Sequence, residues 1–198
     1  MGKNINRFVC SSCGQVSSKW LGKCPGCLSW NTMVEESYEK KVVSRSRKIE
    51  AIPLTSISDQ DIVRVSTGIS ELDRVLGGGI VPGSVVLLGG DPGIGKSTLL
   101  LQVANFIARD SKTVIYLSGE ESLKQIRLRS LRLNIHNDNI YLLNEQDIDL
   151  LDEYIKKINP ELVIIDSIQT VYSPDISSIP GSISQLRECT ARITNIAK

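Results

Sequence analysis

The sequence predicts an α/β protein with a small additional module at its N-terminus. Residues 85–88 form a short apolar run, residues 89–97 are rich in glycine, and a helical pattern of apolar residues follows directly. Further short apolar runs then alternate with amphipathic stretches, which is typical of helices packed on a mainly parallel sheet. Four of the five cysteines lie before residue 28, outside this pattern, and define the additional module.

Composition and charge exclude several classes of protein. The 198 residues suffice for one core and a small appendage. With 23 Lys+Arg against 22 Asp+Glu the net charge is +1, so any basic surface must be local. No apolar run reaches the ~18 residues of a membrane span, and the N-terminus lacks the apolar core of a signal peptide. We therefore expect a cytoplasmic protein, in which paired cysteines serve more often as metal ligands than as disulfides.

The first element, residues 1–34, is predicted to be a zinc-binding module. Its ligands are two C-x-x-C pairs separated by ten residues: Cys10, Cys13, Cys24 and Cys27. Two such turns aim four thiolates at one point, as tetrahedral Zn²⁺ requires. Two disulfides or an iron site are the alternatives. Trp20 and Trp30 are expected to pack over the metal, with stacking on a nucleobase as the second interpretation.

Residues 35–65 are predicted to be a basic linker. This stretch has few large apolar residues, and it contains a basic run without an acidic residue: Lys40, Lys41, Arg45, Arg47 and Lys48. A solvated, flexible connector explains this composition. Contact with a phosphate backbone is the alternative.

The third part, residues 66–198, is organised around a phosphate-binding loop. Residues 90–97 fit G-x-x-x-x-G-K-[ST], between an expected buried strand at 85–88 and a helix. Glycines let backbone N–H groups converge on a triphosphate, Lys96 supplies a positive charge, and Ser97 offers a hydroxyl to Mg²⁺. The predicted nucleotide-binding residues are Gly90, Asp91, Pro92, Gly93, Ile94, Gly95, Lys96, Ser97 and Thr98.

The remaining elements are predicted from the pattern of apolar residues and from the residues that begin or end helices and strands. A capping box at residues 70–73 opens a short helix that three glycines at 77–79 end. Strands are predicted at 113–118, 140–143 and 162–166, and helices at 123–133 and 147–158, the last stopped by Asn159-Pro160. Residues 173–185 are rich in Ser, Pro and Gly and are expected to form a mobile loop. Cys189 falls on a predicted helix, and we expect its side chain to pack in the core rather than to react.

Three carboxylates are candidates for chemistry at the ends of these strands. Asp166 ends an apolar strand, where a carboxylate is costly unless it meets a cation, so it is predicted to hold Mg²⁺ through water. A helix cap before Ser167 is the alternative. Glu120 and Glu121 follow another strand, at the edge where open sheets bind ligands. Glu120 is the preferred general base, and Glu121 the alternative helix cap.

Together these stretches resemble the RadA (Sms) family of bacterial DNA repair proteins. The matching segments are the two cysteine pairs, residues 20–27 (WLGKCPGC), 67–73 (TGISELD), 76–79 (LGGG), 89–98 (GGDPGIGKST), 116–122 (YLSGEES) and 165–169 (IDSIQ). The resemblance covers nearly the whole chain. The ATP-binding part alone would fit the wider group of RecA-like ATPases.

The resemblance implies a RecA-like P-loop core, incomplete here, and a DNA-dependent, helicase-like ATPase of recombinational repair. Members of the family promote branch migration with the RecA recombinase, act on single-stranded and branched DNA, and form homo-hexameric rings. ATP, Mg²⁺ and Zn²⁺ are the implied cofactors. By motif match, the residues that bind ATP and Mg²⁺ are Lys96, Ser97 and Asp166. Glu120 is the catalytic glutamate, and the four cysteines bind zinc.

The sequence departs from the family at its C-terminal end. Family members continue past the position of Lys198 with further core strands, a Lys-Asn-Arg-Phe-Gly motif and a Lon-protease-like domain. We therefore expect a truncated chain, with weak or absent ATP hydrolysis and poor solubility, because the strands expected at 85–88 and 162–166 lack the strand that lies between them in RecA-like cores.

Two other functions stay open: a zinc-dependent docking module with a non-hydrolysing, nucleotide-gated loop, and a KaiC-like signalling ATPase.

Overall fold

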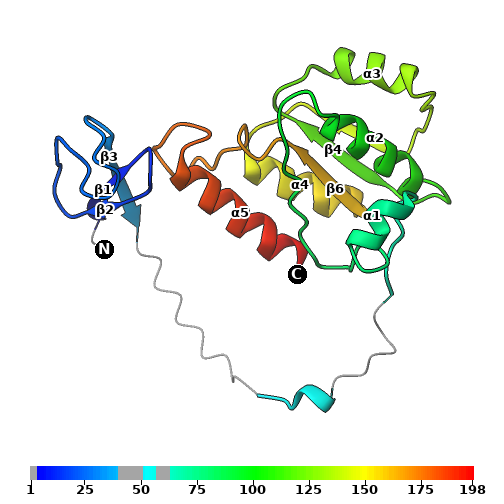
Figure 1. The fold of residues 1–198 in the computed structure, drawn as a ribbon, viewed down its shortest axis with the longest axis horizontal. Coiled ribbons are helices and arrows are strands. Elements are labelled where there is room, and N and C mark those ends of the chain that lie inside the picture. The colour runs from blue at the N-terminus through cyan, green and yellow to red at the C-terminus, as the bar shows by residue number, and fades with distance from the viewer. Residues whose placement is uncertain (1–3, 40–50, 57–62) are drawn as a thin grey trace.

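The chain forms a small antiparallel sheet followed by an α/β unit in which helices cover both faces of a parallel sheet (Figure 1). A computed structural model describes residues 4–39, 51–56 and 63–198. The basic run at residues 40–48 lies outside the described residues. None of the helices in the described part combines the length and the apolar character that crossing a bilayer requires.

The N-terminal sheet consists of β1 (Asn4–Cys10), β2 (Val16–Ser17) and β3 (Met33–Glu39), in the order β2-β1-β3. Both pairings are antiparallel, and Cys10 lies opposite Met33. Cys10, Cys24 and Met33 are buried and form almost the whole core of this module. So small a core indicates that a bound metal must supply most of the stability.

The second sheet consists of β4 (Val114–Ser118), β5 (Ile140–Leu143) and β6 (Leu162–Asp166). Its order is β5-β4-β6 and both pairings are parallel. Every residue of β4 is buried, because this strand is central and is covered on both faces. The three strands predicted at 113–118, 140–143 and 162–166 are confirmed.

Helices cover the two faces of this sheet. α1 (Ser70–Val75), α2 (Lys96–Ile107) and α3 (Leu123–Arg132) precede α4 (Ile148–Ile158) and α5 (Ile183–Ala197), and a short 3₁₀ helix, η1, spans Leu54–Ser56. The face of β4 that carries Val114 and Tyr116 packs on α2 and on Ile126 of α3. The opposite face, with Ile115 and Leu117, packs on α4 and on Cys189 of α5.

The buried strand expected at residues 85–88 is not formed. Val85, Val86 and Leu87 expose 46%, 51% and 85% of their surface. Within the described residues, this segment has no sheet partner, and β6 pairs with β4 alone. A strand is stable only when its N–H and C=O groups find a neighbour, so an apolar run without one stays extended and exposed.

Two local expectations are also corrected. The predicted capping box at Ser70 is absent: Ile69 is the N-cap of α1, and the carboxylate of Asp73 instead accepts hydrogen bonds from Ser66 and Thr67.

The loop predicted to be mobile at residues 173–185 is instead held by hydrogen bonds of the buried Gln185 side chain. Its amide group donates to the carbonyl oxygens of residues 173, 176 and 178 and accepts from the backbone N–H of residue 173.

Candidate nucleotide-binding and zinc sites

The phosphate-binding loop leads directly into the N-terminus of α2. Gly93 and Gly95 have φ angles of 80° and 104°, which side-chain-bearing residues rarely adopt. The Lys96 ammonium folds back over the loop and donates to the carbonyl oxygens of Gly90 at 2.8 Å and Asp91 at 2.9 Å. The loop, the lysine and the helix N-terminus thus bring positive charge together in the way that anion sites require.

Asp166, at the end of β6, is held by a tyrosine of the neighbouring strand. The hydroxyl of Tyr116 donates to Asp166 Oδ2 at 2.7 Å. Burial, reinforced by this carboxylate, holds the pKa of Tyr116 above its usual range. The phenol therefore stays a hydrogen-bond donor at neutral pH and fixes the orientation of the carboxylate. The second oxygen of Asp166 has no protein partner among the described contacts and is available to a hydrated cation.

The carboxyl ends of β4 and β6 bring Glu120 beside the residue that follows Asp166. The register of the parallel pair places Ser118 opposite Asp166. Two residues past Ser118, the carboxylate of Glu120 accepts a hydrogen bond of 2.5 Å from the hydroxyl of Ser167. Glu120 remains exposed to solvent. An exposed carboxylate held beside the Asp166 end of β6 has the geometry of a group that orients or deprotonates water.

Glu121 has different surroundings. Its carboxylate forms an ion pair with Arg129 of α3, and its backbone N–H donates to the hydroxyl of Ser118. The alternative of Glu121 as the helix cap is wrong, because Ser122 caps α3 and forms a capping box with Gln125. Glu121 is therefore tied to the scaffold, whereas Glu120 faces solvent.

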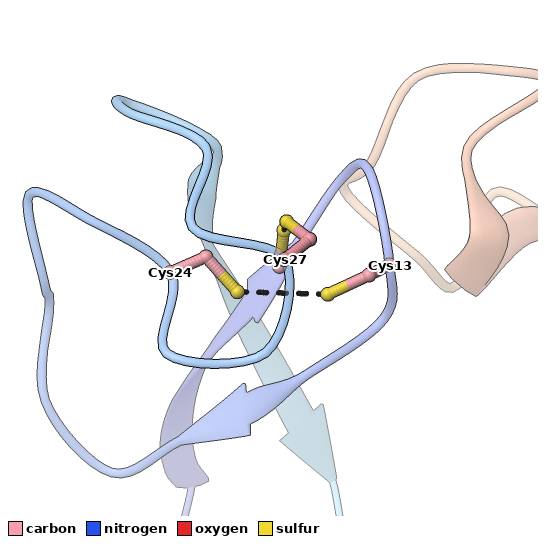
Figure 2. Close-up of side chains that lie close together, drawn as sticks. Cys13, Cys24 and Cys27 are labelled. Carbon is pink, nitrogen blue, oxygen red and sulfur yellow. Dashed lines mark hydrogen bonds between the residues drawn. The ribbon is translucent and has the colours of Figure 1, made fainter.

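The four N-terminal cysteines converge on one point. Their Sγ atoms all lie within 4.8 Å of one another. The Cys10–Cys27 and Cys13–Cys24 sulfur pairs are 3.6 and 3.5 Å apart. Figure 2 shows the sulfur atoms of Cys13 and Cys24 pointing toward each other. A tetrahedral Zn²⁺ with bonds of about 2.3 Å places its sulfurs about 3.8 Å apart, so the four residues fit this ion.

Polar groups around the sulfurs suit metal binding. Burial raises the pKa of the Cys10 thiol, but hydrogen bonds with Thr32 and with the backbone at Ser12 and Cys13 outweigh burial and lower this pKa to about 6. The backbone N–H of Gly26 lies 3.4 Å from Cys24 Sγ. Because Zn²⁺ binds the thiolate form, these contacts favour the ligand state of Cys10. For Cys13, a hydrogen bond with the backbone of Gln15 lowers the thiol pKa, but burial and the three neighbouring sulfurs outweigh it and raise this pKa to about 12.

The tryptophans of this module do not pack over the metal. Trp20 and Trp30 expose 56% and 69% of their surface, so the packing interpretation is wrong. The ligand turns are held by their own backbone hydrogen bonds, such as Leu28 N–H to the carbonyl of Cys24 at 2.9 Å. The module therefore closes around its cysteines without either indole.

Sequence reasoning missed the residues that hold the two acidic groups, Tyr116 and Ser167. One signal for Tyr116 was available, because a buried tyrosine hydroxyl inside an apolar strand must find a polar partner. Ser167 gave no signal of its own, since its contact with Glu120 depends on the order of β4 and β6 in the sheet.

These features define the class of the protein: an α/β P-loop nucleotide-binding fold with a four-cysteine metal module. The chain belongs to the AAA domain family, whose profile matches residues 52–196. Residues 8–35 match a second family, described as the rubredoxin metal binding domain. The two matches agree with ATP and Mg²⁺ at the phosphate loop and Zn²⁺ at the cysteines.

The chain is similar over nearly its whole length to bacterial DNA repair proteins named RadA, which confirms the resemblance found in the sequence. Identity is 52% to the protein of Bacillus subtilis and 51% to that of Listeria monocytogenes, covering 100% and 99% of this chain. It is 46% to the protein of Chlamydia muridarum, over 97% of this chain. The chain spans only 45%, 44% and 43% of these relatives.

A solved structure confirms the fold. A KaiC-like protein from Pyrococcus horikoshii superposes with a TM-score of 0.56, at 21% identity, over 69% of each chain. Identity this low shows the shared RecA-like fold and nothing about activity.

Proposed function

We propose that this chain is part of a DNA-dependent ATPase of recombinational DNA repair. The observation that carries the proposal is the combination of a four-cysteine module and a phosphate-loop core in one chain that is 52% identical to a RadA protein over its whole length. The phosphate loop would bind ATP, and the energy of hydrolysis would be used on DNA.

The proposed residue roles rest on motif match, and the contacts of Asp166 and Glu120 support them. Lys96 binds the β- and γ-phosphates, and Ser97 together with Asp166 holds Mg²⁺, with Tyr116 orienting the carboxylate of Asp166. Glu120 is the proposed general base, because it is exposed and lies beside Ser167 at the carboxyl end of the sheet.

The finer parts of the proposal rest on what the resemblance to the RadA (Sms) family implies. We infer that the full-length protein promotes branch migration of recombination intermediates together with a RecA recombinase. Its DNA partners would be single-stranded and branched, its assembly a homo-hexameric ring, and its location the cytoplasm. We also propose that residues 66–198 act as the ATPase core, and that the zinc module and basic linker, expected at 1–34 and 35–65, meet after residue 39, because β3 pairs with β1 up to Glu39.

The first experiment measures ATP hydrolysis by this chain with and without single-stranded DNA, beside Lys96→Ala. We expect the hydrolysis that this chain retains to be weak, to rise with DNA and to disappear in the variant, because Lys96 supplies the charge at the phosphates. A measurable rate that is equal in both proteins would contradict the proposal. The location of zinc in the chain is measured separately, by metal analysis of Cys24→Ser.

One observation favours a second function, a zinc-dependent docking module with a nucleotide-gated, non-hydrolysing loop. The segment that precedes the phosphate loop has no sheet neighbour among the described residues and is exposed, so the loop has weak support on that side. This function predicts DNA or protein binding that survives Lys96→Ala and is lost in Cys24→Ser. The ATPase function predicts that both changes abolish DNA-stimulated hydrolysis.

A further inference from the structure

The zinc module presents its two tryptophans on a common patch. Trp20 and Trp30 expose 56% and 69% of their surface. A Cβ atom placed on Gly22 would lie 3.6 Å from the Trp20 ring and 3.9 Å from the Trp30 ring. Both indoles therefore border the same position on the surface. Clustered aromatic side chains on a surface mark a site of interaction.

The backbone that carries the indoles is fixed by the metal ligands. Lys23 and Trp30 form an antiparallel bridge, and the Asn31 N–H donates to the carbonyl of Gly22 at 2.8 Å. Cys24 and Cys27 lie in the loop that this short ribbon closes. Metal binding thus fixes the backbone at Trp30, and two residues from Trp20, before any partner arrives, which lowers the entropic cost of binding.

Charge identifies the kind of partner. Residues 1–34 contain no Asp or Glu, and their basic residues are Lys3, Arg7, Lys19 and Lys23. Lys19 and Lys23 are exposed on either side of Trp20 in the sequence. The Lys23 ammonium lies 5.6 Å from the centroid of the Trp30 ring, which still exposes most of its surface. Aromatic rings beside ammonium groups, with no carboxylate nearby in the sequence, suit a strand of stacked bases and phosphates.

The patch lies away from the contact between the zinc module and the ATPase core. That contact is made by Gly14, which faces Ile183 and Arg187, and by Glu36, which accepts a hydrogen bond from Ser178. Figure 2 shows the Cys13 turn on the side of the core ribbon and Cys24 on the other side. A ligand can therefore reach the turn that carries Cys24 and Cys27 without displacing the module.

We propose that Trp20 and Trp30 form a stacking platform for unpaired bases of a single-stranded nucleic acid, with Lys19 and Lys23 contacting its phosphates. Stacking uses the π-face that every base has, so the platform binds without strong sequence preference. This inference rests on the proposed function, because it assigns one DNA contact of the ATPase to the zinc module.

Intrinsic fluorescence tests the platform directly, because Trp20 and Trp30 are the only two tryptophans of the chain. The zinc-loaded chain is titrated with oligothymidylate of about 12 nucleotides, within the site sizes of single-strand-binding modules. We expect saturable quenching. Trp20→Ala and Trp30→Ala should each weaken binding about tenfold, and Trp30→Phe should retain most of the affinity. Lys19→Ala and Lys23→Ala should reduce the salt dependence of binding.

Matched controls separate stacking from charge and from unfolding. An abasic strand of equal length keeps the phosphates, so it should bind more weakly and leave the fluorescence unchanged. Zinc content confirms that each variant is folded around its metal. Equal quenching by the abasic strand, or unchanged affinity in both Trp→Ala variants, would overturn the platform. Absence of quenching at saturating DNA would also overturn it and assign the indoles to a protein partner.

The same titration distinguishes this inference from the proposed function. DNA-stimulated ATP hydrolysis with unchanged tryptophan fluorescence would overturn the platform and leave the ATPase function standing. Quenching by oligothymidylate in both the unaltered chain and Lys96→Ala, without stimulated hydrolysis, would support the platform and count against the ATPase function.

Discussion

At the residue scale, two adjacent glutamates have opposite surroundings. Glu121 is paired with Arg129 and its backbone is bound to Ser118, whereas Glu120 is exposed and touches only the Ser167 hydroxyl among the described hydrogen bonds. Glu121 is thus bound to α3 and β4, although its Oε2 atom is buried without a hydrogen-bond partner, whereas the carboxylate of Glu120 is accessible to a substrate. We therefore expect Glu120→Gln and Glu121→Gln to affect the protein differently, although the same chemical change is made at neighbouring positions.

The first prediction concerns Glu120→Gln. The amide keeps an acceptor for the Ser167 hydroxyl but cannot take a proton, so we expect DNA-stimulated ATP hydrolysis to fall by about 10²-fold or more while nucleotide affinity is retained. Glu121→Gln is the matched control and should change the rate by less than about tenfold. A larger loss in Glu121→Gln than in Glu120→Gln would reverse the assignment. Steady-state hydrolysis and binding of a fluorescent nucleotide measure the two quantities.

At the element scale, the turn after β4 depends on a glycine for steric reasons. A Cβ at Gly119 would lie 2.1 Å from Thr170 Oγ1 and 2.5 Å from Thr170 Cβ. Gln146 also donates to the carbonyl of Gly119 at 3.1 Å, so three segments meet at this point. The turn therefore fixes where Glu120 lies relative to Ser167.

The second prediction concerns Gly119→Ala. The added methyl group must displace Thr170 and its loop, so we expect a loss of roughly 1–3 kcal/mol of stability, as for other overpacked sites, and reduced hydrolysis. Thermal unfolding and hydrolysis rates measure both effects. The double variant Gly119→Ala/Thr170→Gly removes the clashing atoms and should recover much of the stability. A single variant as stable as the unaltered chain would refute the steric argument.

The third prediction concerns the start of α1. Hydrogen bonds from the Ser66 hydroxyl at 2.6 Å, the Thr67 N–H at 2.8 Å and the Thr67 hydroxyl at 2.7 Å hold the pKa of Asp73 below its usual value. A depressed pKa contributes stability above the unfolded-state pKa of about 4, and this contribution is lost as the pH falls through the folded-state pKa.

We therefore expect Asp73→Asn to unfold at a lower temperature than the unaltered chain at neutral pH. The difference should shrink as the pH falls below about 4, because the carboxyl is then protonated first in the unfolded chain and, at a still lower pH, in the folded chain. Asp138→Asn, at an exposed loop position, is the control and should follow the unaltered chain throughout. A difference that stays constant with pH would show that the charge of Asp73 is unimportant. Thermal melts across this pH range provide the measurement.

At the scale of the whole molecule, the zinc module is seated on the loop that follows β6. Glu36 of β3 is buried, pairs with Arg7 at 3.2 Å and accepts a hydrogen bond from Ser178. The loop that carries Ser178 is in turn held by Gln185 of α5. The contact therefore links the two parts through a polar network in which the Glu36 carboxylate is bound by both Arg7 and Ser178.

The fourth prediction concerns Ser178→Ala, which removes a hydrogen bond to a charged group. Such bonds contribute roughly 1.5–3 kcal/mol, so we expect weaker docking of the zinc module and faster hydrogen exchange at residues 33–36 and 173–178. Ser177→Ala is the milder comparison, because Ser177 donates at 3.2 Å to the backbone carbonyl of Glu35, an exposed hydrogen bond across the same contact. Exchange in Ser178→Ala that is as slow as in the unaltered chain would show that the Glu36 contact does not hold the module. Zinc content should be unchanged in both.

The sequence by itself determined the elements whose signals are local. The four cysteines and the strands β4, β5 and β6 follow from ligand spacing and apolar runs, and the structure places them as predicted. Glycine spacing predicts the phosphate loop, and the helix expected after this loop is formed, whereas the strand expected before it is not. Relatives and family matches agree with this part of the interpretation. These features need no knowledge of distant neighbours, because each is encoded within a short window.

The tertiary structure alone decided what depends on neighbours. Residues 85–88 form no strand, since no described segment pairs with them, although their apolar run predicts one. The order β5-β4-β6 brings Tyr116 to Asp166 and Ser167 to Glu120, contacts that the sequence separates by 50 and 47 positions. Strand pairing and burial depend on segments that lie far apart in the sequence, and a short sequence window does not contain both segments.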